Sequence, residues 1–415
     1  MPVMETTADA DRSLRALLEG FWFDDSPQLE ATAQHLAAAD PAVDARGEAT
    51  RVLLEGVRQA WERGWQPADV VHVVRRETSP REARLAIALV AEEARLTSAI
   101  TRAPGEWVDQ LHALGALPDG PPGGVHAWHR IENRSPADAW RGVLLLAGQL
   151  RVLFPMPQLL PPPSQWSVRP SAPRSTHGRG PASQGDQRIL RRVRALLAKA
   201  ESTEFPEEAD ALTAKAQELM STHALDAAVL EAGDLAAPRE GVRSRRLHVD
   251  EPYLEAKMTL LARVGEANGV RTVWYRAIGI ATVVGMPVDL ETTELLFTSL
   301  LVQAGRAMNA AGAADGAHAR SAAFRRSFLR SFGWRIGERL VAARSHATAE
   351  AAEAASVDLL PILRSRQQAV DDVYDELFPS ATGRRSRAFD AAGWAAGQRA
   401  ADSADLSRRR GPLTR

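Results

Sequence analysis

The chain has 415 residues, of which 45% are hydrophobic and 25% charged, which is typical of a globular protein with more than one core. It carries 51 basic and 52 acidic residues, so the net charge of −1 excludes a strong overall attraction to nucleic acid. It has no cysteine, which excludes disulfides, thiolate metal sites and cysteine nucleophiles.

Composition also bears on where the protein works. A chain without cysteine suits a reducing compartment. Acidic residues precede any apolar run at the N-terminus, unlike in a secretory signal. The most apolar run, Val143 to Leu150, is too short to cross a bilayer. We therefore expect a cytoplasmic protein with no membrane association.

The first 154 residues show apolar spacing and start signals that are typical of helices. We expect an all-helical domain over residues 1–154, with a scaffolding or partner-binding role through its helices. The expected helices are Ser13–Phe23, Pro27–Ala39, Glu48–Gly64, Gln66–Arg76, Pro80–Arg102, Pro104–Leu114 and Pro136–Phe154. Residues 155–185 are rich in Pro, Ser and Gly without periodicity, which predicts a mobile linker.

Residues 186–229 are typical of two helices joined by a tight turn. Pro206 suits the first turn of the second helix, where its missing N–H is not needed. Two apolar stripes predict that the helices close face to face as a hairpin. The first stripe is Ile189, Val193, Leu196, Leu197 and Ala200, and the second is Ala209, Leu212, Ala216, Leu219, Met220 and His223.

This stretch contains a basic helix that runs into LLAKAEST, then a Glu-Ala pair, then AKAQELMSTHAL. In these features it resembles the domain-of-unknown-function family 2786, which occurs in actinobacterial and phage proteins. Residues 247–406 more loosely resemble the domain that usually follows it. The resemblance implies a family and a neighbour domain, and it implies no reaction.

Residues 242–406 are expected to form an α+β domain, followed by a basic tail over 407–415. Arg243–Asp250 is a weakly alternating strand, and Val270–Tyr275 and Ile278–Val284 are rich in strand-forming residues, which predicts a hairpin. The expected fold class is mainly α, with a small antiparallel sheet. The expected helices are Pro252–Asn268, Asp289–Asn309, Ser321–Ala355 as one long helix or two with a kink near Gly333–Gly337, Pro361–Leu377 and Arg384–Ala401, with a loop over Ala311–His318.

Two basic helix faces are the candidate nucleic-acid-binding residues, because arginine recognises phosphate with a planar fork. The second face adjoins Trp334, which could stack on a base. The alternative interpretation is an amphipathic helix whose aromatics are core and whose arginines are solvated or paired. The residues are Arg188, Arg191, Arg194 and Lys199 on the first helix, and Arg325, Arg326, Arg330, Arg335 and Arg339 on the second.

Two groups of residues have the spacing of metal ligands on a helix. His126, His129 and Glu132 match no known metal signature, and we interpret them as surface residues of an irregular segment. His346 and Glu350 lack the second histidine of an HExxH motif. No phosphate loop or nucleophile elbow is present, so we expect no cofactor and no metal.

The leading hypothesis is a non-enzymatic interaction protein that binds nucleic acid through arginine-rich helix faces. One alternative is a hydrolase-like C-terminal domain with a site around His318, His346 and Glu350. Another is a scaffold for protein partners, built on the N-terminal helices.

Overall fold

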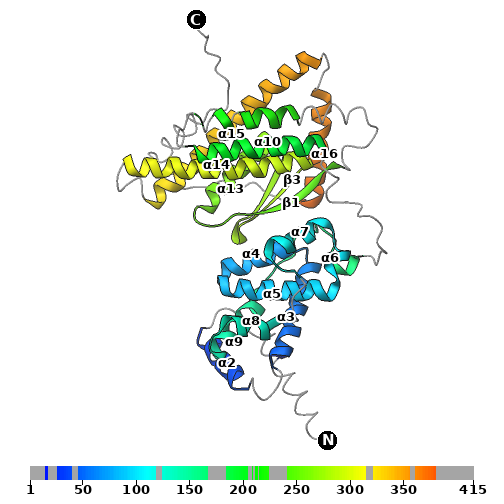
Figure 1. The fold of residues 1–415 in the computed structure, drawn as a ribbon, viewed down its shortest axis with the longest axis vertical. Helices are drawn as coiled ribbons and strands as arrows, with labels where there is room; N and C mark the ends of the chain where they lie inside the picture. The colour runs from blue at the N-terminus through cyan, green and yellow to red at the C-terminus, as the bar shows by residue number, and fades with distance from the viewer. Residues whose placement is uncertain are drawn as a thin grey trace. The chain divides into compact units, whose positions relative to one another are not determined.

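The computed structural model divides the chain into two compact units, Met1–Pro181 (unit 1) and Ala182–Arg415 (unit 2), which are described separately (Figure 1). The described residues are 15–16, 26–39, 45–117, 124–166, 184–203, 208, 211–213, 215–223, 241–314, 321–355 and 360–379.

The secondary-structure elements described in unit 1 are all helices, as the periodicity predicts. Two details differ from expectation. Ser98 adopts a left-handed conformation (φ 55°), which splits the expected long helix at Pro80–Arg102 into two. Gly124–Glu132 is helical rather than irregular. The helices are α2 (Ser26–Ala39), α3 (Ala45–Glu62), α4 (Pro67–Glu77), α5 (Pro80–Thr97), α6 (Ala99–Arg102), α7 (Gly105–Leu114), α8 (Gly124–Glu132) and α9 (Pro136–Arg151).

Tryptophans form the centre of unit 1. Trp61 and Trp107 are both 1% exposed, and their rings meet edge to face with centroids 5.2 Å apart. Trp166 packs on the other side of Trp107 in the same manner, at 5.4 Å. Edge-to-face ring pairs of this kind stabilise the fold beyond the contribution of the large apolar area that the rings bury.

Trp166 lies in the stretch that composition predicts to be a mobile linker, and for residues 155–166 that prediction is wrong. The Trp166 carbonyl accepts a hydrogen bond from Arg102 Nη2 at 2.7 Å, and Met156 N donates to Arg63 O at 2.8 Å. Both ends of this proline-rich segment are therefore held on unit 1. Proline-rich chain without periodicity can still pack when it brings a large aromatic side chain.

Unit 2 combines helices with a three-stranded antiparallel sheet in the order β1-β3-β2, which confirms the expected fold class. Leu247 of β1 and Trp274 of β2 both pair with Ala281 of β3. The elements are α10 (Gln184–Ser202), β1 (Arg243–His248), α13 (Leu254–Ala267), β2 (Arg271–Tyr275), β3 (Ile280–Gly285), α14 (Pro287–Ala314), α15 (Ala322–Ala355) and α16 (Leu360–Leu377).

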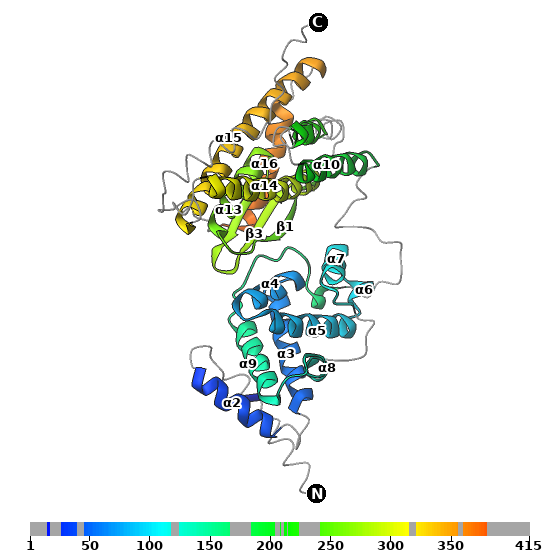
Figure 2. The same ribbon diagram turned by 60° about the vertical axis from the view of Figure 1, so that its left-hand side comes forward.

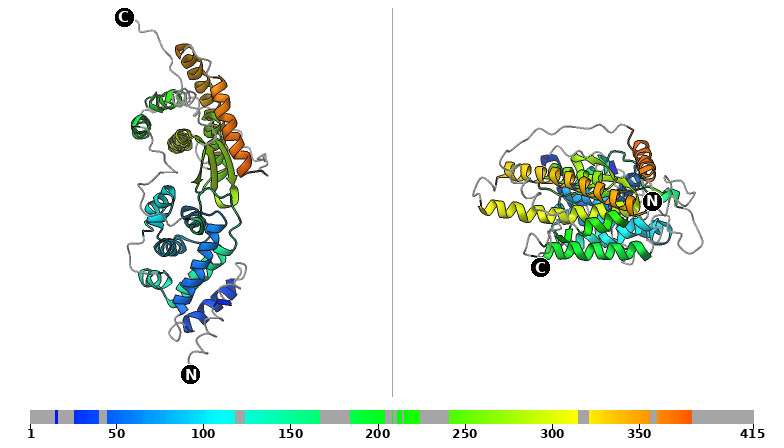
Figure 3. Two further views of the ribbon diagram at one scale, coloured as in Figure 1. Left: turned by 90° about the vertical axis from the view of Figure 1, so that its right-hand side faces the viewer. Right: turned by 90° about the horizontal axis from the view of Figure 1, so that it is seen from above.

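The central strand β3 is buried along its whole length because both faces of the sheet are covered. Ala281 and Val283 join the core formed with α13, α14 and α15, whereas Val284 packs against Val370 and Phe378. The left view in Figure 3 shows α16 on the opposite side of the sheet from α14.

The α13–α15 pair contains the close packing of unit 2. Phe324, Phe328 and Phe332 are each 1% exposed. Of the two expected arrangements the structure has the single long helix, since α15 runs without a break through Gly333 and Gly337. A Cβ added at Gly333 would lie 3.0 Å from the Leu260 backbone of α13, and one at Gly337 would lie 2.8 Å from Arg263 Cβ. Both glycines let the two helices approach closely.

Two further expectations concern the remaining chain. Residues 311–314, expected in a loop, continue α14. The expected helix Arg384–Ala401 and the basic tail lie outside the described residues. Among the residues that the structure describes, no helix is long and apolar enough to cross a membrane.

Candidate functional site: a basic helix face and a polar cavity

Both helices of the hairpin pack on the rest of unit 2. Val193, Leu197 and Ala200 of α10 are at most 3% exposed, and α10 lies against α14. The second helix, described at residues 211–213 and 215–223, buries Ala216 and Met220 as predicted. Leu212, Leu219 and His223 are half-buried.

A polar stripe on the second helix escaped the sequence analysis. Thr213, Gln217 and Ser221 recur every fourth residue and are 1%, 1% and 7% exposed. Gln303 of α14 donates to Thr213 at 2.9 Å, and Gln217 Nε2 donates to Asn268 Oδ1 at 3.3 Å. Hydrogen bonds of this kind select one register of docking, because a shift would leave buried polar groups without partners. The signal was the spacing of three polar residues within the family motif.

The α10 face opposite its buried stripe is basic. Arg188, Arg191, Arg192 and Arg194 are all exposed, and none forms an ion pair with another residue that the structure describes. Arg188, Arg191 and Arg192 lie on the far side of the helix from Val193 and Leu197, and Arg194 lies at the edge of that buried stripe, as an amphipathic period requires. We call these four arginines the α10 basic face.

Lys199 differs from them. Its Nζ lies 2.9 Å from Glu208 Oε1. Thr203 and Lys199 donate hydrogen bonds to Glu208 and thereby hold the pKa of its carboxyl below the usual range. Lys199 is thus engaged at the turn of the hairpin and is a weaker candidate for phosphate.

The α15 residues fall into two groups. The apolar stripe Phe324, Phe328, Phe332, Ile336 and Leu340 is core, as the alternative interpretation expects. Arg326 is exposed, whereas Arg325, Arg330, Arg335 and Arg339 are half-buried.

Two of the expected α15 contact residues are engaged by neighbours. Arg335 Nη1 lies 2.9 Å from Glu338 Oε2. Trp334 is 43% exposed, but the Arg263 guanidinium stacks 3.7 Å from its ring centroid. One face of Trp334 is therefore covered, which weakens its candidacy for stacking on a base.

The two basic helices are not neighbours in the layered arrangement of unit 2. The α14 helix lies between α10 and α15 in Figure 2 and in the right view of Figure 3. The α10 face therefore stands as a separate candidate from the arginines of α15.

The histidine groups have structural explanations. His129 of α8 is 8% exposed, rather than on the surface as expected, and its Nε2 lies 3.1 Å from Arg134 O. Glu132 binds Arg84 through both carboxylate oxygens at 2.6 and 2.9 Å, which holds its pKa below the usual range. Within the described ranges, no group of three His, Asp or Glu side chains could hold a metal ion.

The expected hydrolase-like site is only partly within the described chain. His346 Nε2 lies 3.4 Å from Glu350 Oε1, one turn apart on α15. Their side chains are 77% and 70% exposed, so the pair stands in solvent rather than in a cleft. His318 lies outside the described residues.

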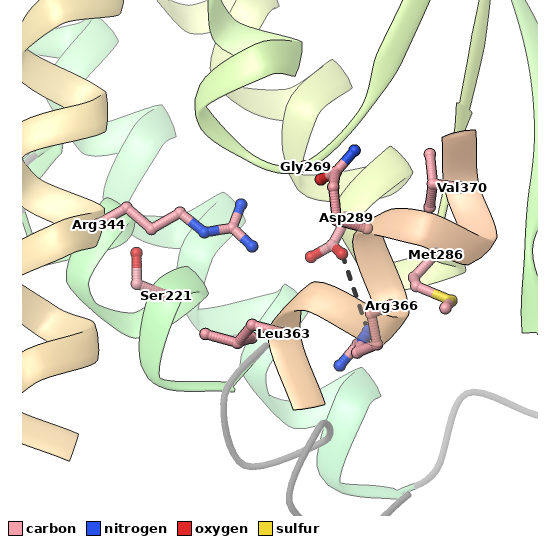
Figure 4. Close-up of a pocket in the computed structure, with 9 residues that line it drawn as sticks. Ser221, Gly269, Met286, Asp289, Arg344, Leu363, Arg366 and Val370 are labelled. Atoms are coloured by element: carbon pink, nitrogen blue, oxygen red, sulfur yellow. Dashed lines mark ion pairs between the residues drawn. The ribbon is translucent and has the colours of Figure 1, made fainter. Parts of the chain in front are cut away.

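A small polar cavity lies where the second hairpin helix meets the start of α14 and the helices α15 and α16 (Figure 4). Its volume is about 30 Å³. Its polar lining residues are Ser221, Asp289, Arg344, Arg366 and Gln367.

Asp289 is the charged centre of this cavity. It is 8% exposed and lies in the first turn of α14. Arg366 Nη2 lies 3.8 Å from its Oδ2. Burial raises the pKa of Asp289, and the positive charges of Arg344 and Arg366 oppose that rise. In the sequence Asp289 is indistinguishable from an ordinary helix-start residue, because the arginines that face it are 55 and 77 positions away.

A second buried carboxylate lies in unit 1. Glu93 is 1% exposed, and burial raises its pKa to about 7, a rise that the neighbouring Trp61 indole and the charge of Arg58 oppose. It is part of the packed interface between helices and does not line the cavity of unit 2.

Comparison with known proteins gives one match, and it falls on the hairpin. No curated protein and no solved structure matches the chain. Residues 188–227, which include most of α10 and the second hairpin helix, match the family described as "Protein of unknown function (DUF2786)". This match confirms the resemblance for that segment.

Proposed function

We propose that this protein binds the phosphate backbone of nucleic acid through the α10 basic face. The observation that carries the proposal is the exposure of Arg188, Arg191, Arg192 and Arg194 on the solvent-facing side of α10. Exposed guanidiniums that keep their hydrogen-bond donors available suit phosphate oxygens.

The dimensions of the α10 basic face fit a backbone. From Arg188 to Arg194 the helix rises about 9 Å, at roughly 1.5 Å per residue. A duplex strand advances about 3.4 Å per phosphate, so the face spans about three phosphates. Contacts of this kind carry no base specificity, and we expect DNA and RNA to bind with similar affinity.

The proposal includes a cytoplasmic location and a non-enzymatic role. Support for the location comes from the absence of cysteine in the sequence. The net charge of −1 limits long-range attraction, so binding depends on the local face.

The test is fluorescence anisotropy of labelled mixed-sequence DNA and RNA with the full chain over a salt series. We expect affinity to fall steeply with salt, and the triple variant Arg188→Gln/Arg191→Gln/Arg194→Gln to reduce the log–log slope by roughly 2 to 3, at about 0.9 per lost phosphate contact.

A matched control separates this face from overall charge. Arg130, Arg134 and Arg141 are three exposed arginines of unit 1. Their triple substitution by Gln changes the net charge equally and is expected to leave the slope unchanged. The proposal would be refuted if both triple variants reduced the salt slope equally, or if the parent protein showed no salt-dependent binding.

A further inference from the structure

The cavity at Asp289 holds more positive than negative charge. Arg344 and Arg366 enter from α15 and α16, and Asp289 is the one acidic residue among those that line it. Figure 4 shows the Arg344 guanidinium pointing toward the Asp289 carboxylate across open space. No contact within 4.0 Å joins these two side chains, although opposite buried charges attract strongly.

Hydrogen-bond donors converge on that space. Within the described part of the chain, Arg344 makes one hydrogen bond, from Nη1 to Ala267 O at 3.0 Å, which leaves most of its five donors available. Ser221 Oγ accepts from Gln217 at 3.3 Å, so its own proton can be donated. Gly269 borders this space, and a Cβ there would lie 3.4 Å from both Arg344 Nη atoms, within ordinary van der Waals contact.

An occupant that satisfies these groups must accept hydrogen bonds on one side and donate one to the Asp289 carboxylate on the other. We propose that the cavity is a binding site for hydrogen phosphate, held by Arg344 and Arg366 with its P–OH donated to Asp289. The cavity of about 30 Å³ exceeds the roughly 10–15 Å³ that one water needs, so a small oxyanion fits.

This geometry distinguishes phosphate from sulfate. Both are tetrahedral oxyanions, but sulfate carries no proton at neutral pH and would face the Asp289 carboxylate, whenever that group is ionised, with oxygen against oxygen. A hydrogen bond to a charged group corresponds to roughly a 10- to 100-fold difference in affinity. We expect phosphate to bind tighter than sulfate by about this factor.

The protonation of Asp289 adds a pH dependence. Burial raises its pKa, and Arg344, Arg366 and His223 are the charged or titratable groups that face it from α15, α16 and the second hairpin helix. Protonated Asp289 can donate to sulfate, so sulfate binding is present at low pH and is lost as pH rises through the raised pKa. Hydrogen phosphate supplies its own proton and should bind at both pH values.

The experiment is isothermal titration calorimetry of the full chain with inorganic phosphate and with sulfate, at about pH 6 and about pH 8 on either side of the imidazole range. Stronger binding of phosphate, with the largest ratio at the higher pH, is expected. Absence of phosphate binding, or equal affinities at the higher pH, would overturn the proposal without the need for any variant.

Three variants test the assignment of roles. Asp289→Asn offers an amide donor to sulfate at every pH, so the preference for phosphate should vanish. Arg344→Gln should weaken both anions roughly tenfold or more. Arg364→Gln removes an exposed arginine of α16 and should change neither affinity. A preserved preference in Asp289→Asn would contradict the role of the carboxylate.

Two further measurements complete the test. Substitution of His223 by Gln should leave the phosphate preference intact, because the preference is assigned to the Asp289 carboxylate. A 5′-phosphorylated oligonucleotide should not compete with inorganic phosphate, and competition would overturn the assignment to the free ion. The site does not depend on the α10 basic face, and the α10 triple variant should bind phosphate normally.

Discussion

The two arginine-rich helices of unit 2 use the same residue type in opposite ways. In α10 the four arginines of the basic face are exposed, and the helix packs through small and aliphatic side chains. In α15 most arginines are half-buried beside a phenylalanine stripe that is 1% exposed. Similar charge patterns in sequence thus correspond to a surface in one helix and to the packing of a core in the other.

The difference follows from what each helix packs against. The α15 helix packs against α13 and α14, and most of its arginines are half-buried beside these neighbours, where long arginine stems can cover apolar surface. The α10 helix belongs to a hairpin and presents one complete face to solvent. Stability should therefore depend on α15, whereas nucleic-acid binding should depend on α10.

The largest expected effect is on the α15 stripe. Substitution of Phe328 by Ala removes a side chain that is 1% exposed and should lower the free energy of unfolding by about 3–5 kcal/mol. Chemical denaturation of the protein, monitored by circular dichroism, measures this change in the free energy of unfolding. Arg191→Ala on the α10 basic face is the counterpart and should stay within about 0.5 kcal/mol. Equal losses would remove the distinction between the helices.

A smaller loss is expected where α15 meets α13. A Cβ at Gly337 would lie 2.8 Å from Arg263 Cβ, so Gly337→Ala should cost about 1–3 kcal/mol through overpacking. Gly305 of α14 has nothing within 4 Å of such a Cβ, and Gly305→Ala should instead stabilise by about 0.5–1 kcal/mol. The two thermal unfolding curves should move in opposite directions.

The anchoring of the hairpin gives a third test. Gln217→Ala removes the donor to Asn268 Oδ1 from a buried site and should cost about 1–3 kcal/mol. The adjacent Glu218 is exposed, and Glu218→Ala should have little effect. If both substitutions behave alike in denaturant titrations, the polar stripe does not hold the hairpin in place.

The smallest effects are expected for the ion pairs on the two helices. Lys199 pairs with Glu208 at 2.9 Å, and Arg335 pairs with Glu338 at 2.9 Å. Each pair is exposed, so Lys199→Gln and Arg335→Gln should each cost less than about 1 kcal/mol. The loss should shrink further at high salt, which differential scanning calorimetry in two salt concentrations can measure.

Local patterns predicted the helices, the order of elements and the β2–β3 hairpin well, because side-chain periodicity reports burial directly. Local patterns did not predict features that depend on a contact with a residue distant in the sequence. The sequence left open whether Gly333 and Gly337 interrupt the helix. In the structure these glycines allow the close approach of α13. Composition places Trp166 in a linker, because the sequence does not show that its ring packs against Trp107 of a distant helix.

The two candidate sites also differ in how far the sequence could predict them. The exposure of Arg188 and Arg191 follows from the helical period within α10, so the sequence could propose that face. The cavity depends on Asp289, Arg344 and Arg366, which lie on three different helices, and no local pattern brings them together. A fourth helix contributes Ser221, which belongs to a polar stripe that resembles an ordinary solvent-facing row in sequence.

The polar stripe has a kinetic consequence. Thr213 and Gln217 hold the second hairpin helix to Gln303 and Asn268 through hydrogen bonds, which contribute less net free energy than the aromatic packing of α15. The hairpin should therefore open as a cooperative unit below the free energy of global unfolding. In hydrogen-exchange experiments, amides of residues 215–223 should exchange earlier than those around Phe328. Each opening would expose the Ser221 wall of the cavity, so the rate at which an anion enters or leaves could be set by the motion of the hairpin.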